Sequence, residues 1–221
     1  FIVQYLHYLG GIFRLDFGTT FAGREVIDVL GDTFPVTLRL AVEAVVMAFV
    51  LAIVIGGLSA FFKNTWFDHT MLIVSLIFVA IPVFVVGFFA QYFIGVKLGW
   101  ASPTVGADNG WFGLILPAIT LAFSIYATSM RLTRSSTIET LGQDWVRTAY
   151  GKGLPRRRVI PVHVLRNSLI PMITDLGTTF GILMVGATVT EAIFNIPGVG
   201  NTLYLAIIKH EAPTIVSFVT V

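Results

Sequence analysis

The chain reads Asp144-Trp145-Val146-Arg147-Thr148-Ala149-Tyr150-Gly151-Lys152-Gly153-Leu154 between two long apolar segments, Leu114–Leu132 and Ser168–Thr190. A helix needs about 20 predominantly apolar residues to cross a bilayer, and each flanking segment is close to that length. A polar, basic stretch between two such segments belongs outside the hydrocarbon. It therefore decides the fold: membrane-crossing helices joined here by one large hydrophilic connection.

The composition supports a membrane protein throughout. Apolar residues make up 56% of the chain and charged residues 12%, whereas charged residues are about a quarter of a soluble domain. Together with a mean hydropathy of +0.87, this predicts an all-α, polytopic transmembrane helical bundle. The absence of cysteine excludes disulfides and thiolate chemistry and leaves the redox compartment undetermined.

Charge is distributed unevenly and predicts the orientation. Residues 131–166 carry eight Lys or Arg against two acids, a net charge of +6, and the rest of the chain nets −4. Basic loops between spans mark the cytoplasmic side. We therefore predict a cytoplasmic loop at 133–167, with residues 1–35 and 191–214 on the outside. A nucleic-acid or anionic-lipid patch is the alternative, but the basic run is short and flanked by hydrocarbon. No nucleic-acid partner is therefore expected.

Four complete spans and one truncated span are expected, within about six for the full protein. Pro35 is predicted to begin the first span and Pro82 to kink the second. Residues 1–35 form the extracytoplasmic segment and residues 36–221 the transmembrane domain. The predicted spans are Val36–Phe62, Met71–Val96, Leu114–Leu132, Ser168–Thr190 and the truncated run Ile215–Val221.

Two acids fall within predicted spans, Glu43 and Asp175. Glu43 lies four residues after Arg39, so one interpretation is an ion pair near the interface. The other is a place on a water-filled pathway, because ionisable groups at membrane depth usually face a cavity or a partner. Both interpretations are open for Glu43, and Asp175 is a second pathway candidate.

The chain shows no energy source of its own. Gly151-Lys152-Gly153 is too short for a phosphate-binding loop, and no metalloprotease or nucleophile-elbow motif occurs. The four histidines are far apart, so no metal site is predicted. Two intramembrane acids are few for an ion-coupled carrier. A partner is therefore expected to supply the energy.

The segment Asp144–Leu154, followed by Arg158-Val159, His163, Leu165-Arg166-Asn167 and Pro171, closely resembles the cytoplasmic motif of binding-protein-dependent ABC importer permeases. Within these it is similar to the oligopeptide/dipeptide/nickel group. The resemblance extends to Pro35-x-Thr37-Leu38-x-Leu40-Ala41 and to Glu191-x-x-Phe194-x-x-Pro197-Gly198-x-Gly200. The long segment before the first span resembles the first, or B-type, of the two paired permeases.

The resemblance implies a type I ABC importer permease fold and a pore-forming subunit with no ATPase site and no cofactor of its own. ATP and magnesium would bind to two partner ATPase subunits. A second permease subunit, an extracytoplasmic substrate-binding protein and membrane lipid would complete the surroundings, in a bacterial inner membrane. Oligopeptides or dipeptides are the expected substrates, with nickel complexes or glutathione as alternatives in the same family. A self-contained channel or secondary carrier is the alternative from another class.

The resemblance assigns Asp144–Leu154 to a coupling helix that contacts the ATPase. Its residues are Asp144, Trp145, Val146, Arg147, Thr148, Ala149, Tyr150, Gly151, Lys152, Gly153 and Leu154. The pattern agrees, because Trp145, Val146, Ala149 and Tyr150 form a short apolar stripe that a partner's groove would cover. On physics alone, a helix lying on the inner membrane surface is an equal alternative.

Two further segments have open interpretations. The turn with Pro197, Gly198, Gly200 and Asn201 opens a scoop-like outer segment, 191–214, which the resemblance places near the binding protein's docking surface. An ordinary interfacial turn is the alternative. The triplet Arg156-Arg157-Arg158 fits either a contact with lipid or a contact with the ATPase.

Overall fold

The computed structural model describes residues 10–11, 16–106 and 112–220. Residues 1–9 and 12–15 of the predicted extracytoplasmic segment lie outside this part. The described chain is helical apart from connecting loops and a single bridge between Thr19 and Glu25. Its elements are α2 (Val26–Phe61), α3 (Trp66–Ala80), α4 (Val83–Ala90), η1 (Gln91–Lys97), η2 (Phe112–Leu114), α5 (Ile115–Leu141), α6 (Asp144–Gly151), α7 (Arg156–Val159), η3 (Ile160–Leu165), α8 (Arg166–Ser168), α9 (Ile170–Gly186), α10 (Thr188–Phe194), α11 (Val199–Ile208) and α12 (Ala212–Thr220).

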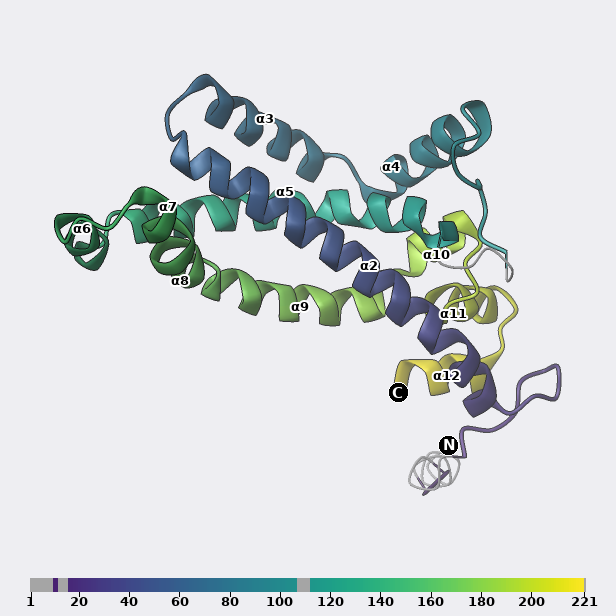
Figure 1. The fold of residues 1–221 in the computed structure, drawn as a ribbon. Helices are drawn as coiled ribbons and strands as arrows, with labels where there is room; N and C mark the ends of the chain where they lie inside the picture. The colour runs from purple at the N-terminus through teal and green to yellow at the C-terminus, as the bar shows by residue number, and fades with distance from the viewer. Residues whose placement is uncertain (1–9, 12–15, 107–111, 221) are drawn as a thin grey trace.

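Helices α2 and α5 form the centre of the bundle (Figure 1). Both bury a stripe of small residues, which lets two backbones approach closely without lipid between them. The approach is tightest at Gly56, where a Cβ atom would lie 2.6 Å from the Met130 carbonyl oxygen. On α2 this stripe comprises Ala41, Ala44, Ala48, Ala52, Gly56 and Ala60.

Helix α2 begins ten residues earlier than predicted. Pro35 lies inside the helix instead of at its start. The turns before it are held by packing, because Val26 is buried against Phe17 and Phe218. Thr33 also donates its hydroxyl to the Val29 carbonyl oxygen at 2.9 Å. The span and the predicted extracytoplasmic segment therefore share residues 26–35.

The second predicted span is two helices at a sharp angle. Helix α3 ends at Ala80, and the α4–η1 segment starts after Pro82 and bends away by 95°. Proline lacks the N–H that would continue the ladder of helical hydrogen bonds, so a break here agrees with the sequence. The sequence predicted a kink within one helix, and the structure has a full break between two helices. Helix α3 begins at Trp66, five residues before the predicted start.

Helix α5 extends nine residues past its predicted end at Leu132. Its last turns are packed rather than free: Thr133 is fully buried and donates its hydroxyl to the Ser129 carbonyl oxygen at 2.8 Å. The predicted loop 133–167 is therefore mostly helical, comprising the end of α5 followed by α6, α7 and η3. Helix α9 then returns along the bundle, and α10, α11 and α12 close its other end (Figure 1).

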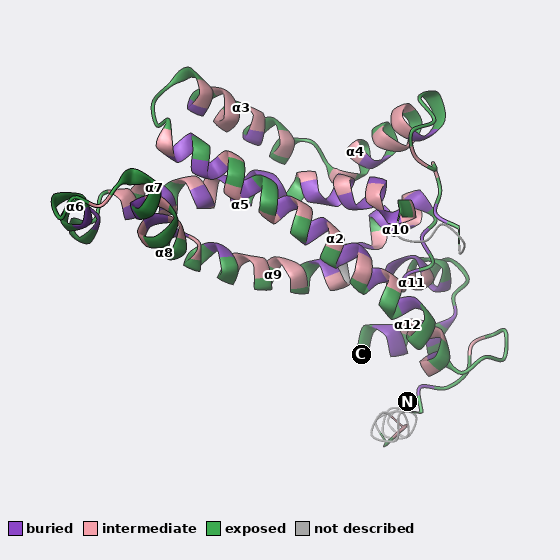
Figure 2. Ribbon diagram, in the orientation of Figure 1, coloured by how far each residue is buried: buried purple, intermediate pink, exposed green. Residues whose placement is uncertain are grey.

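Two helices of the described residues, Val26–Phe61 and Phe112–Leu141, are long and apolar enough to cross a membrane alone. Two bent pairs, α3 with α4–η1 and α9 with α10, reach that length together and bring the number to four if each pair crosses as one span. The predicted fold class, a polytopic helical membrane bundle, is confirmed. Figure 2 shows the burial: the faces that α2 and α5 turn toward each other are buried, whereas much of α6 and α9 is exposed.

Candidate functional site

Helix α6 stands at one extremity of the molecule, beyond α7 and α8 (Figure 1). It begins at Asp144, as the sequence predicts for an acid at the positive end of a helix. Asp144 is almost fully exposed, and its carboxylate lies 3.8 Å from the Arg147 guanidinium, so this pair adds little stability. We call residues 144–168, from α6 through α8, the basic tip.

The apolar stripe of α6 is divided between two surroundings. Val146 and Ala149 are buried against Val159 and Val164, with Leu154 packed beside them. The prediction that a partner's groove would cover the stripe is wrong for Val146 and Ala149, because the chain folds back after Pro155 and covers them itself. The structure divides the stripe into an inward pair that holds α6 in place and an outward pair of aromatic residues.

That outward pair is Trp145 and Tyr150, each 40% exposed. The Trp145 ring lies 6.5 Å from the His163 ring, centroid to centroid, so η3 supports its inner edge. Large exposed aromatic residues on a helix that is packed in place are the kind of surface that partner grooves bind.

Helix α6 ends in a Schellman motif. The Leu154 N–H donates to the Ala149 carbonyl at 3.2 Å, and the Gly153 N–H donates to the Tyr150 carbonyl at 2.9 Å. Gly153 has φ +78°, the left-handed conformation this motif requires. Leu154 then packs against the apolar cluster that contains Ala149. Gly153 therefore permits the tight exit of the chain from α6.

Polar contacts that the sequence analysis missed join α5 to α3 and to the basic tip. Arg134 on α5 forms a two-point ion pair with Asp68 at the start of α3, at 2.5 and 2.6 Å. Asp68 is fully buried and also accepts the Asn64 N–H at 2.9 Å. The Ser136 hydroxyl donates to the Ser168 carbonyl at 2.9 Å and so connects α5 to α8. In the sequence, Asp68 is simply an acid ahead of an apolar run, and nothing in its spacing indicates that it pairs with Arg134. Its burial in the structure shows this role.

At the opposite end, Glu191 organises the turn between α10 and α11. Its carboxylate is fully buried, and it accepts the Thr37 hydroxyl at 2.6 Å and the Asn201 N–H at 2.9 Å. Thr37 in turn accepts the Val199 N–H at 2.9 Å. This network fastens α11 to α10 and to α2. We call residues 191–201 the Glu191 turn.

The glycines of the Glu191 turn are needed for space. A Cβ on Gly198 would lie 2.5 Å from the Glu191 carboxylate, and one on Gly200 would lie 2.5 Å from the Thr188 Cα. The Asn201 side chain donates to the Ile196 carbonyl at 2.9 Å. Of the four residues predicted to dock a binding protein, Gly198, Gly200 and Asn201 are buried and Pro197 is exposed. Burial gives the first three a packing role in the turn.

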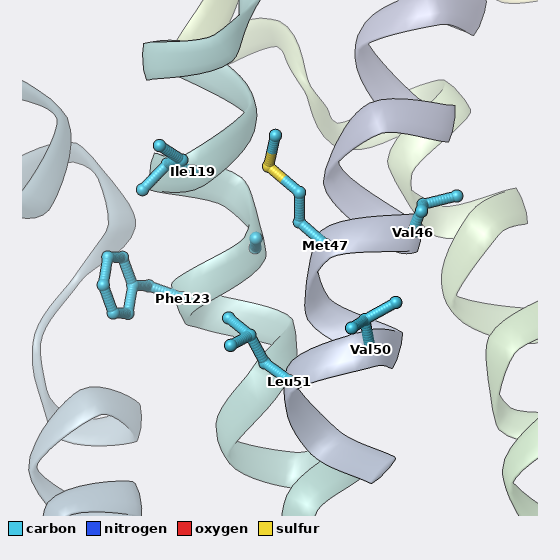
Figure 3. A pocket seen from close by; sticks show the side chains of 7 residues that line it. Val46, Met47, Val50, Leu51, Ile119 and Phe123 are labelled. Atoms are coloured by element: carbon cyan, nitrogen blue, oxygen red, sulfur yellow. The ribbon is translucent and has the colours of Figure 1, made fainter. Parts of the chain in front are cut away.

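The two pathway candidates both have partners within the described chain. The Glu43 carboxylate pairs with the Arg39 guanidinium at 3.1 Å, as the ion-pair interpretation predicts. The Asp175 carboxylate accepts the Ser129 hydroxyl at 3.0 Å, between α9 and α5. Neither acid lines the pocket of about 370 Å³ between α2 and α5, whose lining is almost wholly apolar (Figure 3). Its residues are Val46, Met47, Val50, Leu51, Ile119, Ala122 and Phe123.

Helices long enough to span a membrane, a basic tip with exposed aromatic residues and a buried Glu191 turn define a helical membrane protein. Residues 36–221 match the family model described as "Binding-protein-dependent transport system inner membrane component". The chain belongs to this family. It is thus a permease subunit of an ABC importer and a bacterial inner-membrane protein. The family membership that the sequence motifs predict is confirmed.

Curated relatives agree with the family. The glutathione transport system permease protein GsiC of Shigella flexneri serotype 5b (strain 8401) is 35% identical over 213 residues, covering 96% of this chain and 69% of the relative. GsiC of Salmonella choleraesuis (strain SC-B67) is 35% identical over 214 residues, with the same coverage. GsiC of Escherichia coli (strain K12) is likewise 35% identical over 213 residues, again covering 96% and 69%.

Proposed function

We propose that this chain forms one half of a heterodimeric pore in an ATP-driven, binding-protein-dependent importer of peptides, and that an ATPase subunit docks on α6. The observation that carries this proposal is the division of the α6 stripe. Val146 and Ala149 fix the helix to the chain, while Trp145 and Tyr150 are each left 40% exposed. Aromatic residues held on a rigid support lose little conformational entropy when a partner groove covers them.

The contacts beneath α6 supply a route by which its movement reaches the spans. Only Gly142 and Gln143 separate α5 from α6. The Arg134–Asp68 pair joins α5 to α3, and the Ser136–Ser168 hydrogen bond joins α5 to α8, which directly precedes α9. As a mechanism hypothesis, closure of the ATPase dimer displaces α6 and tilts α3, α5 and α9. This tilting would open the pore of the heterodimer alternately to the two sides of the membrane. ATP and magnesium bind to the ATPase subunits.

Cysteine cross-linking tests the docking. We expect Tyr150→Cys to cross-link to a cysteine in the ATPase groove within the assembled complex. Thr148→Cys, which is exposed on the same helix but outside the stripe, serves as the matched control and should cross-link less. If Tyr150→Cys reacts instead with lipid-soluble probes and never with the ATPase, α6 lies on the membrane and the docking proposal is wrong.

Helix α9 supports pairing with a second permease. It exposes a face of small residues, Thr174, Gly177, Thr178 and Gly181, whose spacing of three or four places them on one side. Small residues allow close helix packing within a membrane. We expect Gly177→Leu to reduce co-purification of the second permease. Ile182→Leu, on an exposed residue further along α9, should not reduce it.

Peptides are the proposed substrate class. The matched relatives carry the name of a glutathione system, and glutathione is itself a tripeptide, which supports this class and the glutathione alternative within it. Uptake by the reconstituted complex, measured with labelled glutathione, a dipeptide, an oligopeptide and a nickel complex, decides among them. Uptake of nickel alone would overturn the peptide proposal.

Pro197 is the exposed residue proposed to lie near the binding protein.

Glu43 and Asp175 are the acids proposed to lie on the substrate pathway. Asp175→Asn keeps an acceptor for the Ser129 hydroxyl. A change in substrate preference at unchanged yield of the complex would therefore support a pathway role. Transport by the permeases in liposomes without ATPase subunits would favour a self-contained channel or carrier instead.

A further inference from the structure

The triplet Arg156-Arg157-Arg158 is the strongest concentration of charge in the described chain that the proposed docking of α6 does not use. All three residues are exposed. None takes part in the four ion pairs formed among the described residues. No acidic residue occurs from Trp145 to Thr174, so nothing in this stretch of sequence neutralises them.

The position of α7 favours a membrane surface over the ATPase. Helix α6 projects beyond α7, and α7 lies at about the level of the loop that joins α2 to α3 along the length of the bundle (Figure 1). That loop ends at Trp66, which is 81% exposed. Exposed tryptophans mark the boundary between hydrocarbon and water. On this basis the triplet stands at the depth expected of lipid headgroups, nearer the hydrocarbon than the helix proposed to meet the ATPase.

The residues that follow the triplet in the sequence expose apolar side chains. Pro161 and Val162 are exposed, the latter at 48%, and Ile170 and Ile173 on the first turns of α9 are each 60% exposed. Arginines next to exposed apolar side chains match an interface where headgroups adjoin acyl chains.

We propose that Arg156, Arg157 and Arg158 bind the phosphates of anionic phospholipids in the adjoining leaflet. The guanidinium group donates two parallel hydrogen bonds to a phosphate, which an ammonium group cannot do. Each basic residue near an anionic surface contributes about 1 kcal/mol, or roughly fivefold in partitioning. Bound lipid at the triplet would fix the base of α6 against the membrane while the tip of that helix meets its partner.

The test uses the whole transporter in nanodiscs of phosphatidylcholine with or without phosphatidylglycerol, with retained lipids and subunits counted by native mass spectrometry. We expect the triple variant R156Q/R157Q/R158Q to lower the preference for phosphatidylglycerol at least about fivefold while retaining the ATPase subunits. The triple lysine variant should keep part of that preference. The wild-type preference should fall as salt is raised, because exposed charges are screened.

A second variant, W145A/Y150A, truncates the two exposed aromatic side chains of α6 and is the matched control. This inference rests on the proposed docking only for that control, which should weaken ATPase retention and leave lipid preference unchanged. If W145A/Y150A retains the ATPase fully, the docking proposal fails and the lipid result still stands. If R156Q/R157Q/R158Q keeps its phosphatidylglycerol preference, or loses the ATPase with lipid preference unchanged, the triplet does not bind lipid and the inference is overturned.

Discussion

The two glycine-marked turns of this chain use glycine for different physical reasons. At the end of α6, Gly153 has φ +78° and a Cβ placed on it would meet no atom within 4 Å. In the Glu191 turn, Gly198 has φ −105°, which any residue can adopt, but a Cβ there would meet the Glu191 carboxylate at 2.5 Å. The first glycine permits a backbone conformation and the second permits close packing.

The two regions therefore differ in role: the basic tip exposes side chains for contact with a partner, and the Glu191 turn holds helices of this chain together. The basic tip leaves Trp145 and Tyr150 exposed, whereas the Glu191 turn buries its polar groups in hydrogen bonds to one another. Substitutions in the Glu191 turn should therefore reduce folding stability, and substitutions on the outward face of the basic tip should reduce partner binding.

Glu191→Ala should have the largest effect. It removes a carboxylate that accepts from Thr37 and Asn201 and leaves both donors buried without it. Losing charge-assisted hydrogen bonds of this kind costs about 4 kcal/mol in total. We expect a large fall in the Tm of the purified protein, with Glu139→Ala, an exposed acid on α5, near wild type. An equal fall for both variants would contradict the central role of Glu191.

Thr37 offers a graded test of the same network. Its hydroxyl both donates to Glu191 and accepts from Val199. Thr37→Val should therefore lower stability by about 2 kcal/mol, because a buried donor and acceptor both lose a partner. Thr37→Ser keeps the hydroxyl and should recover most of the Tm. If Thr37→Ser is as unstable as Thr37→Val, the missing methyl group and not the hydrogen bonds accounts for the loss.

Gly200→Ala should rank next. The added Cβ would lie 2.5 Å from the Thr188 backbone, which cannot rotate away, so α11 must shift. Overpacking of this kind costs about 2 kcal/mol. Gly31→Ala, on an exposed turn of α2 where a Cβ meets nothing within 4 Å, is the control and should raise the Tm slightly. Similar Tm values for the two variants would show that the turn has room to spare.

The sequence predicts the elements better than the contacts between them. The apolar segments predicted the long helices and their order, and the Asp144–Leu154 pattern placed α6 correctly. Helix ends were less predictable. Pro35 is tolerated inside α2 because tertiary packing holds the preceding turns, which no local pattern reveals.

Site residues show the same limit. The apolar stripe of α6 is legible in the sequence, but its division into a buried and an exposed pair depends on where the chain returns after Pro155. The Asp68–Arg134 pair joins residues 66 positions apart, so spacing could not indicate it. The glycines near Glu191 marked a turn, and only the structure shows that they lie around a buried carboxylate.

Gly153→Ala should have a smaller effect than any change in the Glu191 turn. Its cost comes from holding alanine in a left-handed conformation, about 1 kcal/mol, because no neighbour obstructs the methyl group. Gly153→Asn should lose less, since asparagine adopts that conformation more readily. Gly151→Ala, which has no positive φ and no close neighbour, should have little effect on the Tm. A loss at Gly151 as large as at Gly153 would show that the Schellman geometry is not what the glycine supplies.

Trp145→Ala and Tyr150→Ala should leave the Tm nearly unchanged and have their effect on binding. Both side chains are 40% exposed, so truncation removes little packing within the chain, and surface changes of this kind usually alter stability by less than about 0.5 kcal/mol. A buried aromatic residue at an interface contributes about 2 kcal/mol or more, which corresponds to roughly a thirtyfold loss of ATPase affinity. Val146→Ala should show the reverse, because Val146 is 1% exposed and packs within the basic tip: a lower Tm, and weaker binding only in proportion to the unfolded fraction. If Val146→Ala and Tyr150→Ala change Tm and ATPase affinity alike, α6 has no separate inward and outward faces, and the contrast between the basic tip and the Glu191 turn fails at its weakest point.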